Sequence, residues 1–398
     1  MVVIPPLRRA TPAAVRATYL DAVRGLAVLA CISAGMGVAQ VARHFPDDAT
    51  WQVLARQTQP AAWVGCTGWD MIQPAFFFLV GVSLTYSAGR RWAQRRSLLR
   101  MLPRAVLRAV VLVALGILVA SEGAEQTRWT FVNPLAQIGL GYLFAFFLWR
   151  CHAVVQAAAA ALILGGWWAS FAFTPPPPEG FDFAAVGAEA GPLPGAAAAW
   201  TKNANPATYA DQRFLNLFPR TERFTHDPQG RTTLAFLPGV ATMLLGLLAG
   251  SLFRSTSPWW SKLLWPILGG GLLLGAGLAL HEYHLCPIVP RLGSPSWVLY
   301  SGGWLLWALT ASYLLVNLLR ARWLVWPLAV PGSNPLPLYL LAMLAAPWFE
   351  RTLATHFGPA YANSFGAPFA PLVRAAAGVL LLWLLALWMH RRRAYLRL

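Results

Sequence analysis

The residues whose chemistry stands out in this chain are a few polar and ionisable groups embedded in apolar sequence. The stretch WVGCTGWDMIQPAFFFLVG, Trp63–Gly81, carries Asp70, Gln73 and Pro74 before it becomes wholly apolar. A carboxylate there could accept a proton from a nucleophile, whereas an aspartate at a helix start is often only an N-cap. Asp70 is therefore a candidate catalytic residue, and Gln73 a candidate site-lining residue.

A second pair of ionisable groups interrupts the first apolar run, YLDAVRGLAV. Asp21 and Arg24 are three residues apart, so they share one face of a helix and can form an ion pair. Ionisable residues at membrane depth often belong to functional sites. The pair is a candidate lining of a site, or else a structural pair at its rim.

The seven histidines supply the candidate general bases. His44 lies in ARHFPDDATW beside Asp47 and Asp48, and it is the second candidate catalytic residue. His281 and His284 have the spacing of metal ligands, but no third ligand is evident, so no metal site is expected.

The composition indicates where these groups lie. The chain is 57% hydrophobic and 11% charged, against about 25% charged in soluble domains. Its 20 Trp are typical of a membrane interface. We therefore predict an all-α fold, a polytopic integral membrane helix bundle with lipids as partners. The net charge of +17 is concentrated between apolar runs, which argues against a nucleic-acid partner.

Apolar runs close to the roughly 20 residues that cross a bilayer predict about ten (nine to eleven) membrane helices in a single membrane domain, residues 1–398. They lie near Tyr19–Val41, Asp70–Ala88, Ala105–Ser121, Asn133–Trp149, Ala153–Phe173, Thr232–Phe253, Leu263–Leu280, Trp297–Leu319, Trp323–Trp348 and Pro371–His390. With this topology 19 of 31 basic residues fall on the side of the termini, and 13 of 14 acidic residues fall on or near the other side. The positive-inside rule then predicts that both termini are cytoplasmic.

Residues 174–231 form the longest segment between apolar runs, and we expect a long extracytoplasmic loop there. Part of it, WTKNANPATYADQRFLNLFPR, is too rich in polar and aromatic residues for a plain linker, and long loops in compact domains are often functional. Its candidate site-lining residues are Asn203, Asn205, Asp211, Asn216 and Arg220.

A basic cytoplasmic loop is expected at residues 90–104. Arginines recur every four residues along it, which places them on one face of a helix. They would either contact anionic lipid headgroups or bind a phosphorylated cofactor. The candidate cofactor-binding residues are Arg96, Arg100 and Arg104.

The ninth apolar run is broken at WPLAVPGSNPLPLYLL, where prolines and a glycine surround Asn334. Non-helical backbone at membrane depth is tolerated where it is buried in protein or lines a wet cavity. We expect the break to face a cavity lined by Asn334, or else to be a short loop between half-buried helices. Cys66 and Cys286 are both expected on the outer side, so a disulfide between them is open but weakly supported.

Several blocks of the chain, from Leu20 to about Leu341, together carry a resemblance to a known family. The sequence resembles the heparan-α-glucosaminide N-acetyltransferase family and its bacterial relatives. The blocks are YLDAVRGLAVL, WVGCTGWDMIQPAFFFLVGVSLTYS, NPLAQIGLGYLFAFFL, FLNLFPR, TLAFLPGVATMLLGLLAG, LCPIVPRLGSPSWVLYSGGW and PLAVPGSNPLPLYLL.

The resemblance implies a polytopic acyltransferase, expected in the bacterial inner (cytoplasmic) membrane. Such enzymes move an acetyl group from cytoplasmic acetyl-CoA to an amine or hydroxyl of a sugar on the far side. Acetyl-CoA would be a donor substrate, with no permanently bound cofactor, and the basic segment 90–104 would bind the CoA phosphates.

The chain departs from the family pattern at one position. The resemblance implies a catalytic histidine three residues before Trp-x-Gly, but here QTQPAAWVG places Pro60 there, and proline accepts no proton. One hypothesis is an acyltransferase with a displaced base, such as His44, Asp47 or Asp48. Another is an inactive relative that serves as a structural or accessory subunit of a membrane complex or homo-oligomer. A transporter-like protein is a third, although no internal repeat supports it.

Overall fold

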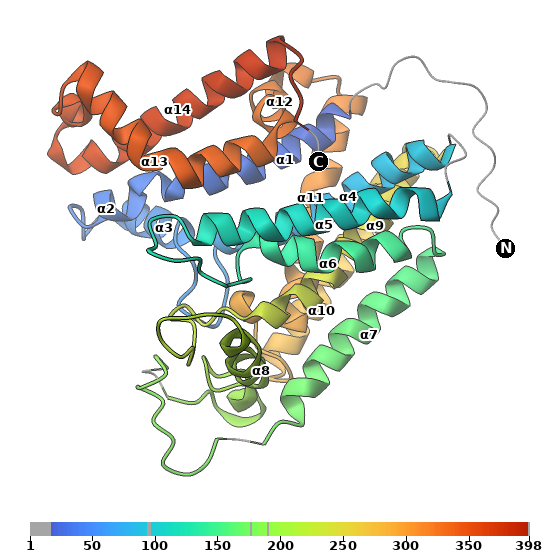
Figure 1. Ribbon diagram of the computed structural model, residues 1–398. Coiled ribbons are helices and arrows are strands. Elements are labelled where there is room, and N and C mark those ends of the chain that lie inside the picture. Colours follow the sequence, from blue (N-terminus) through green and yellow to red (C-terminus); the bar gives the residue numbers. More distant parts are fainter. Residues whose placement is uncertain (1–16, 94–96, 176, 189–190, 397–398) are drawn as a thin grey trace.

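The computed structural model describes residues 17–93, 97–175, 177–188 and 191–396 (Figure 1). Every regular element in these residues is a helix, so the all-α prediction is confirmed. The helices are α1 Thr18–Ile32, α2 Val38–Ala42, α3 Ala49–Gln57, α4 Ile72–Ala93, α5 Leu98–Ala120, α6 Pro134–Leu148, α7 Ala153–Ala172, α8 Pro206–Phe214, α9 Phe236–Arg254, α10 Ser261–Glu282, α11 Pro295–Tyr313, α12 Arg322–Ala329, α13 Pro335–Phe357 and α14 Ala370–Arg391.

Helices occupy all ten of the places where apolar runs predict them. Among the described residues, six helices are long and apolar enough to cross a bilayer. The count is seven if α1 and the helix at 34–42, which are bent by 46°, make one span. The chain is therefore an integral membrane protein, while ten spans and the side of the termini stay predictions.

The basic segment at residues 90–104 is mostly helical rather than a loop. Helix α4 continues to Ala93, and α5 begins at Leu98 with the Ser97 side chain as its N-cap. Both helices therefore extend beyond the apolar runs, because arginines are good helix formers and helix ends at a membrane surface tolerate charge.

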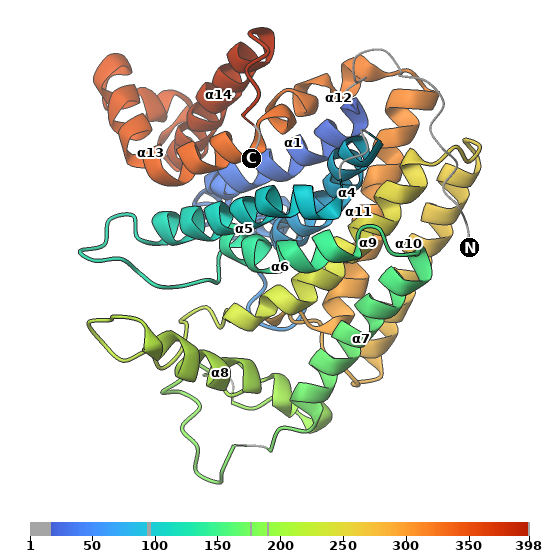
Figure 2. The same cartoon turned by 45° about the vertical axis from the view of Figure 1, so that its right-hand side comes forward.

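Helix α9 runs through the middle of the bundle (Figure 2). In its most apolar stretch 67% of the residues are buried, whereas the share of buried residues in the other candidate spans is 17–44%. It packs closely on α4 because each helix has a glycine at the contact. A Cβ on Gly81 would lie 2.0 Å from the Met243 carbonyl oxygen, and one on Gly246 would lie 2.0 Å from that of Phe78. Such small-residue contacts hold helices together where lipid removes the usual hydrophobic driving force.

The break between α12 and α13 is buried in protein. It packs on α1 by a second glycine contact, where a Cβ on Gly25 would lie 1.6 Å from the Leu328 carbonyl oxygen. Asn334 is fully buried, and its side chain binds the C-terminal tail through the carbonyl of Ala394 at 2.9 Å and the N–H of Leu396 at 3.0 Å. The expected cavity was therefore wrong, because the tail and α1 satisfy the break.

The contact between α1 and the break gives a stability prediction. Gly25→Ala would force backbone apart at a packed site, where overpacking costs on the order of 3 kcal/mol. We expect a clearly lower Tm of the detergent-purified protein, measured by tryptophan fluorescence. The matched control is Gly378→Ala in α14, where a Cβ would meet nothing within 4 Å. Equal Tm values for the two variants would contradict the proposed contact.

Candidate functional site

Polar side chains gather at the two opposite ends of α4 and α9. We call one group the loop-end cluster, because it lies beside the loop at residues 59–68, and the other the terminal-end cluster, because it surrounds the start of α1. Gln73 and Tyr86 mark the two ends on α4, and their 13-residue separation corresponds to about 20 Å of helix. The loop-end cluster is Thr67, Asp70, Gln73, Gln137 and Arg291; the terminal-end cluster is Tyr19, Asp21, Arg24, Tyr86 and Arg254.

Asp70 organises the loop that precedes α4. Its Oδ2 atom accepts hydrogen bonds from the backbone N–H groups of Ala61 and Thr67, each at 3.0 Å. The Thr67 hydroxyl lies between this oxygen at 3.0 Å and the Gln59 carbonyl at 2.6 Å. Since the partners lie before Asp70 in sequence, the N-cap interpretation is wrong, and Asp70 closes a loop instead.

Arg291 holds the same loop from the other side. Its guanidinium donates to the carbonyls of Ala61 at 2.9 Å and Ala62 at 3.0 Å, and also to the carbonyl of Gln229 at 3.0 Å. Burial lowers the pKa of Arg291 from its usual value. Ala61 is thus fixed at both its N–H and its carbonyl, next to the exposed Pro60.

Gln73 belongs to a chain of amide hydrogen bonds inside the loop end of the bundle. Its Nε2 donates to Oε1 of Gln137 at 2.7 Å, and Nε2 of Gln137 donates to the Thr232 carbonyl at 3.0 Å. Gln137 is 1% exposed. The chain joins the starts of α4, α6 and α9, and it presents no ionisable group, so it can orient a ligand but cannot move a proton.

The terminal-end cluster contains the predicted ion pair. Nη1 of Arg24 lies 2.9 Å from Oδ1 of Asp21, and its other terminal nitrogen donates to the hydroxyl of Ser83. The hydroxyls of Tyr19 and Tyr86 share a hydrogen bond. Arg254 donates to the Thr85 carbonyl at 2.7 Å. Two guanidiniums and two phenols therefore meet where α1, α4 and α9 converge.

Four of the predicted residues of the long loop fold the loop itself. Asn203 donates to the carbonyls of Val186 and Asp227, and Asn205 caps α8 through the Thr208 N–H. Asn216 donates to the carbonyls of Gln212 and Phe224. Arg220 donates to the carbonyl of Leu215 and, outside the loop, to that of Trp129, and its guanidinium also lies 5.3 Å from the centre of the Phe224 ring. These bonds stabilise the loop, although the buried Oδ1 of Asn203 has no hydrogen-bond partner among the described residues.

Asp211 joins the long loop to the bundle. It is 1% exposed, and its Oδ2 accepts the Thr233 N–H at 2.8 Å, just before α9. Its Oδ1 has no hydrogen-bond partner among the described residues. Burial raises the pKa of this carboxyl to about 6, despite the opposing hydrogen bond from Thr233.

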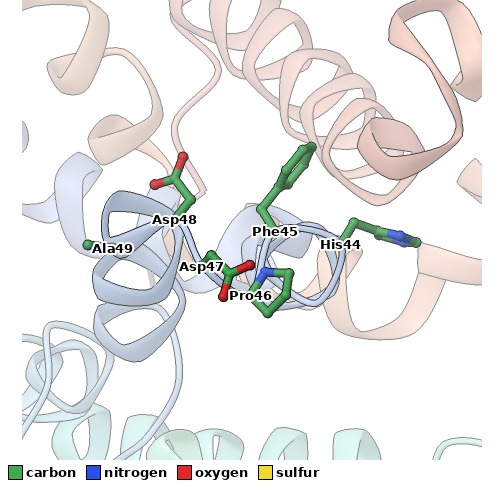
Figure 3. A pocket seen from close by; sticks show the side chains of 6 residues that line it. All are labelled: His44, Phe45, Pro46, Asp47, Asp48 and Ala49. Atoms are coloured by element: carbon green, nitrogen blue, oxygen red, sulfur yellow. The ribbon is translucent and has the colours of Figure 1, made fainter.

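The remaining candidates lie apart from both clusters. His44 is exposed beside a surface hollow of about 550 Å³, and Figure 3 shows its ring and the carboxylate of Asp48 pointing in different directions. Asp48 instead caps α3. Arg100 and Arg104 are exposed on the first turns of α5. Arg96 lies outside the described residues, and Asn334 binds the tail as described above.

The cysteines of the chain are free, so the disulfide between Cys66 and Cys286 is not formed. Cys286 is buried, and its sulfur accepts a hydrogen bond from the Ser296 hydroxyl at 3.6 Å. Burial raises the pKa of the Cys66 thiol, and the Tyr300 hydroxyl lies close enough to oppose this shift.

The sequence-based prediction identified four of the ten cluster residues and missed the other six: Thr67, Gln137, Arg291, Tyr19, Tyr86 and Arg254. Gln137 is the one amide in the apolar run NPLAQIGLGYLF, and that contrast could have identified it. Arg291 and Arg254 gave no local signal, because their partners lie 62 to 230 residues away in the sequence.

Comparison with known proteins assigns most of the chain to one family. The family model described as heparan-alpha-glucosaminide N-acetyltransferase, catalytic, matches residues 16–275, about two thirds of the chain. The match includes the whole terminal-end cluster and all of the loop-end cluster except Arg291. A search of curated proteins found no match.

The buried carboxyl of Asp211 gives a pH prediction. Because its pKa is raised in the folded protein, the folded state binds a proton more tightly than the unfolded state does. The free energy of unfolding therefore falls as the pH rises from about 4 to about 6. Asp211→Asn removes the buried charge and keeps an acceptor for Thr233, so we expect it to raise stability at pH 8 by on the order of 1–3 kcal/mol.

At about pH 3 the two proteins should have nearly the same Tm, because Asp211 is then mostly protonated in both the folded and the unfolded state. Thermal unfolding in detergent at both pH values checks this, with the exposed Asp47→Asn as matched control. A variant effect of the same size at both pH values would contradict it.

Proposed function

Because the chain belongs to the heparan-α-glucosaminide N-acetyltransferase catalytic family, we propose that it is a membrane-embedded acyltransferase. It moves an acetyl or acyl group from cytoplasmic acyl-CoA to a sugar or similar acceptor on the other side of the membrane. The observation that carries the proposal is the placement of two polar clusters at opposite ends of α4 and α9. A donor on one side and an acceptor on the other require such a two-ended bundle.

The proposal includes the topology. About ten spans with cytoplasmic termini would place the terminal-end cluster at the cytoplasmic face and the loop at residues 59–68 outside. Helices at all ten predicted places support this count, and the excess of basic residues beside the termini supports the orientation. A bacterial inner membrane with anionic lipids on its cytoplasmic face suits this charge distribution.

The donor would bind at the terminal end. CoA carries phosphates, which guanidinium groups bind with charge-assisted hydrogen bonds. Arg24 and Arg254 converge at this end, and the exposed Arg100 and Arg104 lie on the helix that follows the end of α4. Together they form a positively charged entrance for the donor.

The acceptor would bind at the loop end, where attack on the thioester needs a base and donors for the developing oxyanion. Asp70 and His44 are the proposed bases. Oδ2 of Asp70 already accepts two backbone hydrogen bonds and lies 3.0 Å from the Thr67 hydroxyl, and His44 lies on an exposed surface, so each would act only through a rearrangement on acceptor binding. The amides of Gln73 and Gln137 could orient the acceptor.

A second candidate function is an inactive relative that acts as an accessory subunit of a membrane complex. Pro60 favours it, because the position that would carry the family's base has no ionisable group. The fully buried middle of α9, including Met243, Leu244 and Leu247, also separates the two polar ends with packed side chains. Transport is less supported, since Asn334 is occupied by the C-terminal tail.

Acetyl-CoA binding tests the transferase proposal. We expect calorimetry on the detergent-purified protein to give a Kd on the order of micromolar. The double variant Arg100→Ala/Arg104→Ala should weaken binding about tenfold or more, because it removes two exposed cations, while Arg128→Ala near the loop end serves as matched control. No binding at about 1 mM donor would reject the transferase and favour the accessory subunit.

Restoring a base tests whether Pro60 is what limits activity. The adjacent residues are held by Asp70 and Arg291, so a side chain at position 60 has a fixed backbone. We expect Pro60→His to increase acetyl transfer from acetyl-CoA to glucosamine by about a hundredfold over the unmodified chain, the lower end of general-base effects. Gln59→His is the matched control. Equal rates in both variants would show that the position carries no special role.

A further inference from the structure

Helices α5 and α6 lie side by side and form a seam (Figure 1). They are antiparallel, because later residues of α5 contact earlier residues of α6. A Cβ on Gly139 would lie 2.7 Å from the Ala109 carbonyl oxygen, and one on Gly116 would lie 2.7 Å from Oδ1 of Asn133. The start of α5 therefore lies beside the end of α6, at the end of the bundle where α4 finishes.

Three arginines follow α5 from this end toward the middle of the helix. Arg100 and Arg104 are exposed, whereas Arg108 is half-buried at the edge of the face that packs on α6. Arg108 lies eight residues beyond Arg100, which is about 12 Å along the helix. Because α5 is a candidate membrane span, Arg108 lies deeper than the level at which Arg100 would meet lipid headgroups. A charge at that depth is costly unless it has a partner.

The protein supplies little to balance this charge. Nη1 of Arg108 donates to the Tyr142 hydroxyl at 3.4 Å, a long bond, and the guanidinium carbon lies 5.0 Å from the centre of the Tyr142 ring. Its buried Nε has no hydrogen-bond partner among the described residues. Neither α5 nor α6 contains an aspartate or a glutamate. The counter-ion of Arg108 must therefore come from outside these two helices.

The surroundings of Arg108 select an anion that also carries apolar chains. Val106, Leu107 and Val110 are exposed on the same stretch of α5, so they cover any ligand at this depth with apolar surface. A small hydrated anion would lose its water there without gaining apolar contacts. A glycerophospholipid instead brings its phosphate and its acyl chains together. The exposed Arg100 and Arg104 repel the cationic headgroup of a zwitterionic lipid and favour an anionic one.

We propose that the seam between α5 and α6 is a binding site for one anionic glycerophospholipid. The guanidinium of Arg108 binds the lipid phosphate by charge-assisted hydrogen bonds. The Tyr142 hydroxyl accepts a bond from Arg108, so its own proton is left to donate to a phosphate oxygen. The acyl chains lie along Leu107 and Val110. The lipid supplies the negative charge that the two helices lack, and it holds Arg108 at its depth in the membrane.

The test uses the full-length protein in neutral detergent, with phosphatidylglycerol as probe and phosphatidylcholine as control, measured by native mass spectrometry. Phosphatidylglycerol should bind with a Kd of about 100 µM or tighter, and at least about fivefold more tightly than phosphatidylcholine. Arg108→Gln should weaken phosphatidylglycerol binding about tenfold. Arg374→Gln removes an exposed arginine from α14, another candidate span, and as matched control should leave binding unchanged.

Tyr142→Phe keeps the packed ring and removes the hydroxyl proton, so it should weaken binding about threefold even if Arg108→Gln fails to fold. Equal binding of the two lipids, or unchanged phosphatidylglycerol binding in Arg108→Gln and in Tyr142→Phe, would overturn the site.

A competition arm separates a lipid phosphate from the phosphates of CoA. Acetyl-CoA at about 1 mM should leave phosphatidylglycerol bound, because the exposed Arg100 and Arg104 proposed for the donor lie nearer the membrane surface than Arg108. Displacement of the lipid by acetyl-CoA would assign Arg108 to the donor site and reject a separate lipid site. Failure of acetyl-CoA to bind at all would reject the transferase and leave the lipid result standing.

Discussion

Close backbone contact through glycine is the constraint on which both polar ends of this bundle depend. Gly81 and Gly246 bring α4 against α9, and Gly25 and Gly332 bring α1 against the break before α13. A β-carbon at any of these positions would overlap a backbone atom. Since lipid gives little hydrophobic reason for helices to associate, these contacts decide where the helix ends lie.

The polar groups then follow a simple physical rule. A polar group in a low-dielectric bundle must find a partner, or its desolvation is not compensated. Asp70, Arg291 and Asn334 meet this rule by binding backbone groups rather than other charges. The loop at residues 59–68 and the break are therefore as well defined as the helices, although neither is regular structure.

The sequence predicted the helices well because apolar runs in a membrane protein have little choice of structure. Lipid offers no partner for the backbone, so a 20-residue apolar run becomes helical whatever its neighbours are. The Asp21–Arg24 pair was also predictable, since both residues lie on one helical turn. The site was less predictable. Asn203 and Asn216 looked like ligand-binding residues because a buried amide that folds a loop and one that binds a solute have the same local sequence.

Partners distant in the chain explain the other errors. The role of Arg291 is visible only when Ala61, 230 residues earlier, is placed beside it. The break at Asn334 was expected to face a cavity because nothing in the local sequence indicates that Ala394, 60 residues later, binds the Asn334 side chain. Asp70 could be recognised as important from its place before an apolar run, yet its actual partners were not deducible from that place.

The binding of the tail by Asn334 has a consequence for biosynthesis. While the chain is being made, the ribosome delivers the amide of Asn334 long before it delivers the carbonyl of Ala394 and the N–H of Leu396 that satisfy it. Until those residues are present, the Asn334 side chain lacks the partners that it has in the folded protein, where it is fully buried. The contact can therefore form only after residues 394–396 have been made, so α12 and α13 are completed by a segment that is synthesised later than both helices.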